Sequence, residues 1–213
     1  MDGVMLETLV PWSLNGITQA PLLCTGEEEE ALLTGHLITS GLVASAGKVR
    51  SVIRSGEIWE VSADLSPEAG MPMVSRLKSM AASRSPRVIR LEELTRLCDQ
   101  VMSLDHSAGL HGILLSDGDK TVVGRDVGRH NALDRAVGLA LQNGLRLENA
   151  VLCSSGRLSL EMFSRAAFAG IPVLATRKQV GSLCVAFAQD LDISVCRLGP
   201  VPRVYSACWR VIK

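Results

Sequence analysis

The second half of the chain alternates between short apolar runs and longer segments in which apolar residues recur every three or four positions. After residue 106 this alternation repeats, with Gly, Ser, Asp or Asn between the two kinds of segment. Short apolar runs are typical of buried strands, and the longer pattern is typical of amphipathic helices. The expected strands are 113–115, 121–123, 150–153, 173–175, 193–196 and 204–206. The expected helices are 131–143, 159–169 and 182–190. This alternation favours an α/β fold with a largely parallel sheet and helices on its faces.

The first half has a different pattern, with two expected hairpins around one helix. Apolar runs at 6–14 and 17–24 flank Asn15-Gly16, the strongest short hairpin signal. Runs at 49–54 and 57–61 flank Ser55-Gly56 and predict a second hairpin. Thr25 and Glu28 match a capping box, which predicts a helix that ends near Ser40.

Between these halves, residues 62–86 lose both periodicities and are rich in Ser, Pro, Ala and Gly. This composition predicts a linker or mobile loop. A helical pattern resumes at 91–104, where Cys98 has the position of a core residue. We therefore expect a smaller N-terminal α+β part, residues 1–86, that ends in this linker, and an α/β domain at 87–213.

Composition narrows the kind of ligand and the location. Lys plus Arg equals Asp plus Glu at 22 each, so overall charge gives no reason to expect nucleic acid as a partner. No run approaches the length of a membrane span, and the first residues lack the basic segment of a signal peptide, so we expect a cytoplasmic protein. The 6 cysteines form neither C-x-x-C nor a metal-ligand spacing with His, so we expect free thiols and no zinc or other metal.

The densest group of polar residues is Gly124–Arg135, which reads G-R-D-V-G-R-H-N-A-L-D-R. It connects an expected strand to an expected helix, for which Asn131 is a suitable N-cap and Asp134 suits the first turn. Arg129 and His130 would then lie beside free backbone N–H groups, which predicts an anion site. The alternative is a solvated, charged turn.

Positively charged residues follow the expected strands at the points where ligands bind in parallel sheets. They are Arg125, Arg129, Arg157, Arg177, Lys178 and Arg197. If the strands are neighbours, these cations meet at one edge and suit a phosphate-rich ligand. For any one arginine the alternative is a surface salt bridge. The chain has no G-x-x-x-x-G-K-[ST] and no G-x-G-x-x-G motif, which argues against a standard NTPase or dehydrogenase.

At these residues the chain resembles the formate dehydrogenase accessory sulfurtransferases, the FdhD family. D-V-G-R-H-N-A-L-D-R at 126–135 is similar to the strongest signature of that family. S-S-G-R-L-S-L-E at 154–161 and A-F-A-G-I-P-V-L at 167–174 are similar to the signatures that follow. S-A-G-L-H-G at 107–112 resembles a weakened Gly-Gly-x-His segment, and His111 would contact a ligand or fill a turn. The resemblance spans nearly the whole chain and is stronger after residue 106.

The resemblance implies a three-layer α/β/α domain similar to cytidine deaminases and a homodimer. It implies binding of the guanine-dinucleotide form of the molybdenum cofactor, with GDP as a mimic. Sulfur would come from a cysteine desulfurase, and the cofactor would go to formate dehydrogenase or another molybdoenzyme. The zinc chemistry of deaminases is not expected, because the H-x-E and P-C-x-x-C elements are absent.

The cations and the resemblance together define the candidate cofactor site. Arg129, Arg157 and Arg197 would pair with phosphates, and the glycines would let the ligand approach the backbone. Asn131 and Asp134 would cap the helix and orient His130. The resemblance adds the loop at 196–201. The full set is Arg125, Asp126, Gly128, Arg129, His130, Asn131, Asp134, Ser155, Gly156, Arg157, Cys196, Arg197, Leu198, Gly199, Pro200 and Val201.

The chain departs from the family where the family carries its sulfur, on a C-x-x-C in the loop between the two parts. The equivalent stretch, 70–90, contains no cysteine. A sulfur carrier needs an accessible, nucleophilic thiolate. The candidates for a relocated carrier are Cys24, Cys153 and Cys196, each of which can instead be a buried small residue. Three hypotheses follow: a sulfurtransferase with a displaced cysteine, a carrier that binds the cofactor or a guanine nucleotide without transferring sulfur, and a nucleotide-binding regulator unrelated to molybdenum.

Overall fold

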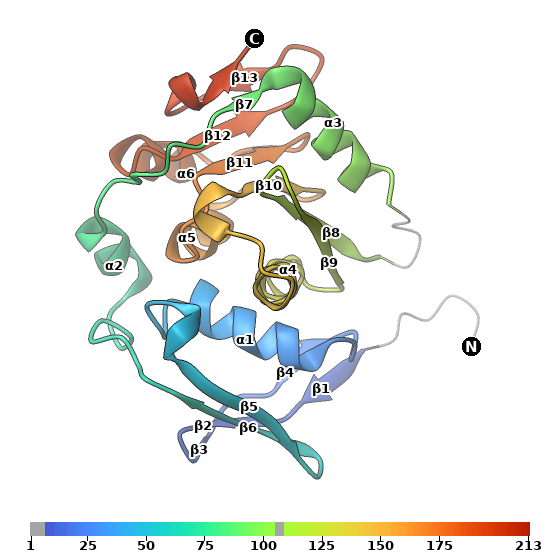
Figure 1. Ribbon diagram of the computed structural model, residues 1–213, viewed down its shortest axis with the longest axis vertical. Helices are drawn as coiled ribbons and strands as arrows, with labels where there is room; N and C mark the ends of the chain where they lie inside the picture. Colours follow the sequence, from blue (N-terminus) through green and yellow to red (C-terminus); the bar gives the residue numbers. More distant parts are fainter. Residues whose placement is uncertain (1–6, 105–108) are drawn as a thin grey trace.

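The computed structural model describes residues 7–104 and 109–213, and its centre is a sheet with strand order β13-β12-β11-β10-β8-β9 (Figure 1). These strands are β8 (His111–Ser116), β9 (Thr121–Asp126), β10 (Val151–Ser154), β11 (Val173–Thr176), β12 (Ser194–Arg197) and β13 (Arg203–Val204). All six strands expected in the second half are therefore present. Ser107-Ala108 of the S-A-G-L-H-G segment and the first six residues, on which the signal-peptide expectation rests, lie outside the described residues.

The sheet is mixed, which corrects the expectation of a largely parallel one. β10, β11 and β12 run parallel, whereas β8 is antiparallel to both β10 and β9. The cause is a tight turn after β8, in which the Asp117 carboxylate accepts hydrogen bonds from the N–H groups of Asp119 and Lys120 at 3.1 and 2.9 Å. No crossover helix can fit in that turn. Because β8 alone is reversed among these five strands, β9 again points in the direction of β10–β12.

Helices cover both faces of this sheet (Figure 1). On one face, α3 (Leu91–Met102) packs on Val151 and Cys153 of β10. On the other, α4 (Arg129–Gln142), α5 (Leu160–Phe168) and α6 (Ser182–Asp190) share a buried cluster with Leu152, whose side chain points opposite to its neighbours in the strand. Ser159 caps α5 as expected, because its hydroxyl accepts from the Met162 N–H at 3.4 Å. Similarity to cytidine deaminases in particular remains a prediction.

The N-terminal part consists of short strands around α1 (Glu29–Thr39). β1 (Thr8–Val10) pairs with β4 (Leu22–Cys24), and a second sheet has the order β3-β2-β6-β5. Its strands are β2 (Trp12–Leu14), β3 (Ile17–Thr18), β5 (Val49–Ser55) and β6 (Ile58–Ala63). Both expected turns exist, with positive φ at Asn15 and Gly16 in the first. The first hairpin is interrupted: β2 pairs with β3 next to the turn, and its outer residues pair with each other as β1 and β4. The capping box was wrong: α1 starts after Glu28 without a side-chain cap.

The N-terminal part is joined to the α/β domain by an unusually close contact between α1 and α4. A Cβ atom at Gly35 would lie 1.7 Å from the Asp134 carbonyl oxygen, and one at Gly138 would lie 1.9 Å from the Ala31 carbonyl oxygen. Only glycine allows the two backbones to approach so closely. As a result, one continuous cluster of buried side chains includes Trp12 and Leu133.

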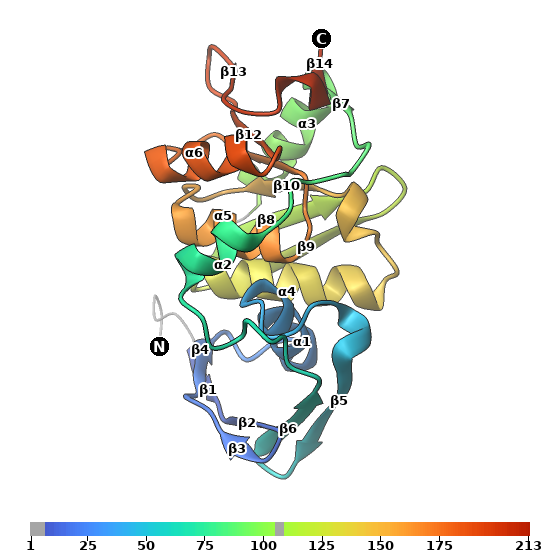
Figure 2. The same cartoon turned by 90° about the vertical axis from the view of Figure 1, so that its left-hand side faces the viewer.

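The segment expected as a linker or mobile loop is more ordered than its composition suggested. It contains α2 (Met73–Ser79), and it runs along the side of the molecule that faces the viewer in Figure 2. It ends in β7 (Ile89–Arg90), which pairs with β14 (Val211–Ile212). Short 3-10 turns complete the chain: η1 (Ala46–Lys48), η2 (Leu147–Asn149) and η3 (Cys208–Arg210). The linker is thus packed against the α/β domain.

Candidate functional site

The carboxyl ends of β9, β10, β11 and β12 lie at the same edge of the central sheet, together with the amino end of β8. This follows from the strand directions and from the register that pairs His111 with Asp126. The loops that follow these strands are therefore neighbours, as the sequence predicted. They lead into the amino ends of α4, α5 and α6, where backbone N–H groups have no helical partner. We call this region the cation edge.

Most of the positive charge at this edge is not neutralised by the protein itself. Across residues 7–104 and 109–213, no carboxylate lies within ion-pair distance of Arg129, Arg157, Lys178 or Arg197. Arg157 and Lys178 are exposed, and the buried Nε of Arg197 has no hydrogen-bond partner. Unpaired cationic groups along one edge of the sheet favour an anionic ligand.

Arg177, in contrast, is engaged in the protein. It forms an ion pair with Asp99 of α3 and donates to the Leu198 carbonyl oxygen at 3.0 Å. The salt-bridge alternative therefore holds for Arg177. Its contacts fasten the loop after β11 to α3 and to the loop after β12.

Asp126 is fully buried at the end of β9, and its carboxylate serves the protein fold. It accepts hydrogen bonds from Arg135 at 2.6 Å, from the Gly128 N–H at 3.1 Å and from the Thr25 N–H at 3.3 Å. Arg135 is itself only 1% exposed. This buried ion pair fixes the turn between β9 and α4 and ties it to the N-terminal part. Thr25 belongs to this contact, which is why it does not cap α1.

The expected roles of Asn131 and Asp134 were wrong. The helix α4 starts one turn earlier than predicted, with Gly128 at the N-cap, and the Asn131 amide donates to the Leu23 carbonyl oxygen at 2.6 Å. Asp134 is fully buried and does not orient His130. Its carboxylate instead joins three helices through Thr39 and His36 of α1, the latter at 2.9 Å, and Arg165 of α5, also at 2.9 Å. Burial would raise the pKa of Asp134, but His36 and Arg165 keep it below its ordinary value.

His130 lies at the amino end of α4, with its Nε2 at 3.3 Å from a carboxylate oxygen of Glu161. Burial lowers the pKa of His130 below its ordinary value, although the Glu161 carboxylate acts in the opposite direction. The imidazole is therefore neutral at pH 7 and can donate or accept a hydrogen bond at the cation edge.

The loop after β10 is rigid and presents its arginine to solvent. Ser155 and Gly112 exchange hydrogen bonds at 2.9 and 3.0 Å, and the Gly156 carbonyl oxygen accepts from the Thr176 hydroxyl at 2.7 Å. Gly156 packs beside His111, where an added Cβ would lie 3.5 Å from the imidazole. Arg157 follows directly on this fixed loop, so its backbone is preorganised for a ligand.

The loop at 196–201 divides into buried and exposed positions. Cys196 and Leu198 point into the core, and the Leu198 N–H donates to the Thr176 carbonyl oxygen at 2.8 Å. Gly199 is half-buried, whereas Pro200 and Val201 are exposed. Of the six candidates from this loop, the side chains that can meet a ligand are thus those of Arg197, Pro200 and Val201. Arg125 lies in β9 directly before Asp126 and is half-buried.

The three cysteines proposed as sulfur carriers are all buried. Cys24, Cys153 and Cys196 have no exposed surface. Burial raises the pKa of Cys24, and it raises the pKa of Cys196 to about 12. A hydrogen bond with Cys98, together with burial, raises the pKa of Cys153 well above its usual range. These thiols are therefore protonated and inaccessible, which makes them poor nucleophiles.

Sequence reasoning missed the one exposed thiol. All six cysteines lie in the described ranges, and Cys208 of η3 alone among them is exposed. No periodicity or motif marks this position in the sequence. It also missed Arg135 and Arg165 as partners of the two buried aspartates, although Arg135 closes the G-R-D-V-G-R-H-N-A-L-D-R segment.

Two further findings concern the described part of the chain as a whole. Within residues 7–104 and 109–213, no three His, Cys, Asp or Glu side chains gather in a way that could bind a metal ion. Within the same ranges, none of the helices is both long enough and apolar enough to cross a bilayer.

Comparison with known proteins gives consistent matches. Residues 5–212 match the model of the FdhD/NarQ family. The chain is 27% identical to the sulfur carrier protein FdhD of Staphylococcus aureus over 91% of this chain and 82% of the relative. It is 28% identical to the sulfur carrier protein FdhD of Streptomyces coelicolor, over 99% and 89%. Its fold is similar to the crystal structure of a proposed formate dehydrogenase accessory protein from Desulfotalea psychrophila, with a TM-score of 0.83, 23% identity and coverage of 97% and 90%.

Proposed function

Because this chain belongs to the FdhD/NarQ family, we propose that it is an accessory protein of formate dehydrogenase that binds the guanine-dinucleotide form of the molybdenum cofactor at the cation edge. The observation that carries the proposal is the group of unpaired cations, Arg129, Arg157, Lys178 and Arg197, in a chain whose net charge is zero. A neutral protein gains little from leaving such charges together unless an anion binds there.

The residues at this edge fit the phosphate portion of such a ligand. Arginine forms paired hydrogen bonds with phosphate oxygens, and the amino ends of α4 and α5 add backbone donors. Arg157 stands on a loop that Ser155 and Thr176 hold in place, so binding costs little ordering of the backbone. His130, neutral at pH 7, adds a hydrogen-bonding group that does not repel a second cation. The bound cofactor would supply the molybdenum that accepts sulfur.

The burial of the thiols bears on the choice between sulfur transfer and cofactor binding alone. Five of the six cysteines are buried, and this favours a carrier that binds and delivers the cofactor without holding sulfur itself. The relatives named sulfur carrier protein support the other candidate, in which a cysteine desulfurase loads this chain. Cys208 would then be the position that receives the sulfur, since its thiol is exposed.

Mass spectrometry separates these two candidates. The protein is incubated with a cysteine desulfurase and cysteine, and its intact mass is compared with that of the Cys208→Ser variant. A gain of one sulfur that thiol reverses and that Cys208→Ser lacks would establish the sulfur carrier. No gain, while a family member with C-x-x-C is labelled in parallel, would establish the carrier that only binds the cofactor. The same proposal includes a homodimer and a cytoplasmic location.

Calorimetric titration with GDP tests the site. Arg157→Ala should weaken GDP binding by roughly 10- to 150-fold, because one charged hydrogen-bonding group contributes about 1.5–3 kcal/mol. Arg129→Ala and Arg197→Ala should weaken it similarly. Arg90→Ala is the matched control, because Arg90 is also exposed but lies in β7, away from the cation edge. Equal GDP affinity in Arg157→Ala and the wild type would remove the cation edge as the binding site.

A further inference from the structure

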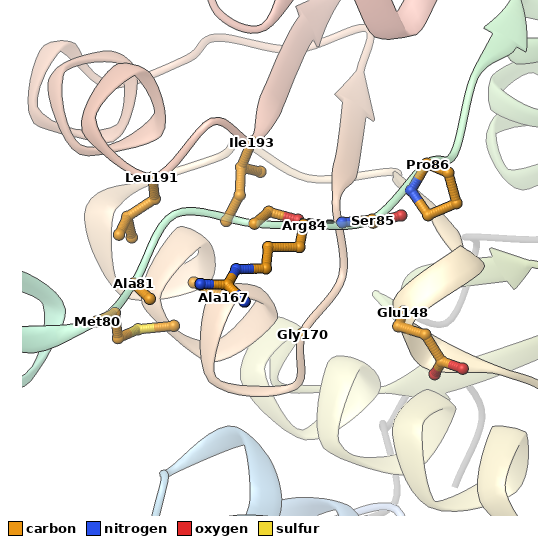
Figure 3. A pocket seen from close by; sticks show the side chains of 11 residues that line it. Met80, Ala81, Arg84, Ser85, Pro86, Glu148, Ala167, Gly170, Leu191 and Ile193 are labelled. Atoms are coloured by element: carbon orange, nitrogen blue, oxygen red, sulfur yellow. Dashed lines mark hydrogen bonds between the residues drawn. The ribbon is translucent and has the colours of Figure 1, made fainter.

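A second region of interest is a cavity at the end of the central sheet opposite the cation edge. It has a volume of about 410 Å³. Its walls come from four places: the linker at 80–86, Glu148 of η2, the end of α5 with Ala167 and Gly170, and the residues Leu191 and Ile193 that lead into β12 (Figure 3). Because β12 begins there, the cavity lies at the amino ends of the parallel strands.

The cavity is preformed rather than created by a loose loop. Arg210 has no exposed surface, and its guanidinium donates to the carbonyl oxygens of Ser83, Ser85 and Arg87. The Ser83 N–H donates to the Leu191 carbonyl oxygen at 2.8 Å. These bonds fix the linker over the cavity. A preformed apolar cavity of this size is the usual form of a small-molecule site.

Two charged side chains line the cavity, and only one of them points into it. The Arg84 side chain lies across the cavity, with its guanidinium near Ala167, whereas the Glu148 carboxylate points away on the far side of Gly170 (Figure 3). None of the ion pairs among the described residues includes Arg84. The cavity thus combines apolar walls with one positive group that reaches into it.

We propose that this cavity binds a small amphipathic monocarboxylate, whose apolar body fills the space between the linker and α5 and whose carboxylate pairs with Arg84. The forked guanidinium matches the two oxygens of a carboxylate. A water molecule takes up about 30 Å³ in the liquid, so the volume holds roughly a dozen non-hydrogen atoms. Medium-chain aliphatic carboxylates have this size. The inference is independent of the proposed function, because no residue of the cation edge lines the cavity.

Titration calorimetry with octanoate, octanol and octylamine tests the proposal on the full chain. Octanoate should bind with a dissociation constant on the order of 1 mM or below. Octanol should bind roughly tenfold more weakly because it cannot form the ion pair, and octylamine should bind least. Arg84→Ala should reduce octanoate binding to the level of octanol. Arg90→Ala, an exposed arginine outside the lining, is the matched control and should bind as the wild type does.

A second variant and a second readout locate the ligand. Ala81→Trp places a large side chain from an exposed linker position into the cavity and should abolish binding of octanoate and octanol alike. Methyl NMR of the wild type requires no substitution: octanoate should shift the Ile193 signal and leave that of Ile53, on the small sheet, unchanged. The proposal is overturned if no binding is detected at an octanoate concentration tenfold higher than ~1 mM. It is equally overturned if octylamine binds better, if Arg84→Ala has no effect, or if the Ile193 signal does not move.

Discussion

Replacing Asp126 by Ala should destabilise the protein more than most single substitutions. The change leaves the Arg135 guanidinium, 1% exposed, without the carboxylate that lies 2.6 Å away. Breaking a buried ion pair by removing one partner costs about 3–5 kcal/mol, because the remaining charge stays buried. Glu28, at 4.0 Å from Arg135, compensates in part, so we expect the free energy of unfolding to fall by about 3 kcal/mol. The Gly128 and Thr25 N–H groups also lose their acceptor.

Urea unfolding followed by tryptophan fluorescence measures this loss. The control is Asp64→Ala, which removes an exposed ion pair with Arg50, and such pairs contribute about 0–1 kcal/mol. The double variant Asp126→Ala/Arg135→Met removes both charges and should recover part of the stability. The structural role would be refuted if Asp126→Ala lowered stability no more than Asp64→Ala. The unfolding slope should stay unchanged, which keeps the comparison valid.

Three further outcomes are expected. The pKa of Asp134 in the folded protein lies below its ordinary value, so its contribution to stability is present above pH ~4 and is lost as the pH falls through that folded pKa. The Asp134→Asn variant should therefore be less stable than the wild type at pH 7. In acid unfolding measurements its stability should decline less steeply with falling pH. With a thiol-specific chromogenic reagent, the native protein should show one fast-reacting thiol, which the Cys208→Ser variant should lack. The other thiols should react only in denaturant. Two or more fast-reacting thiols in the native state would contradict the assigned burial. Gly138→Ala forces α1 away from α4 and should lower the free energy of unfolding by more than about 2 kcal/mol. Gly70 has open space around it, so Gly70→Ala should change the midpoint of thermal unfolding little. Equal midpoints for the two variants would disprove the close contact.

The elements of the α/β domain could be predicted because local patterns determine them. The apolar run before Ser154 and the Ser159 cap depend on near neighbours in the sequence, and both are where the pattern indicated. The direction of β8 was harder to predict. A turn at Asp117 was visible, but whether a strand pair is parallel depends on the connection as a whole and not on the strands.

The candidate site was predicted in outline and not in the roles of its carboxylates. The cations could be placed at one edge, because strand ends in a common direction must meet there. Asp126 and Asp134 look like ligand groups in the sequence, but their partners Thr25 and His36 come from the N-terminal part, about 100 residues away in the chain. The first residue of a helix is also difficult to predict from the sequence. The helix α4 begins at Arg129, and Gly128 before it has an extended backbone.

The contact between Arg210 and the linker has a consequence for biosynthesis. The Ser85 carbonyl oxygen and its donor are separated by 125 residues in sequence. At a translation rate of about 5–20 residues per second, the linker is made roughly 6 to 25 seconds before Arg210 is made. During that interval the carbonyl oxygens of Ser83, Ser85 and Arg87 lack their Arg210 donor, so the linker can be fixed over the cavity only at the end of synthesis of this segment.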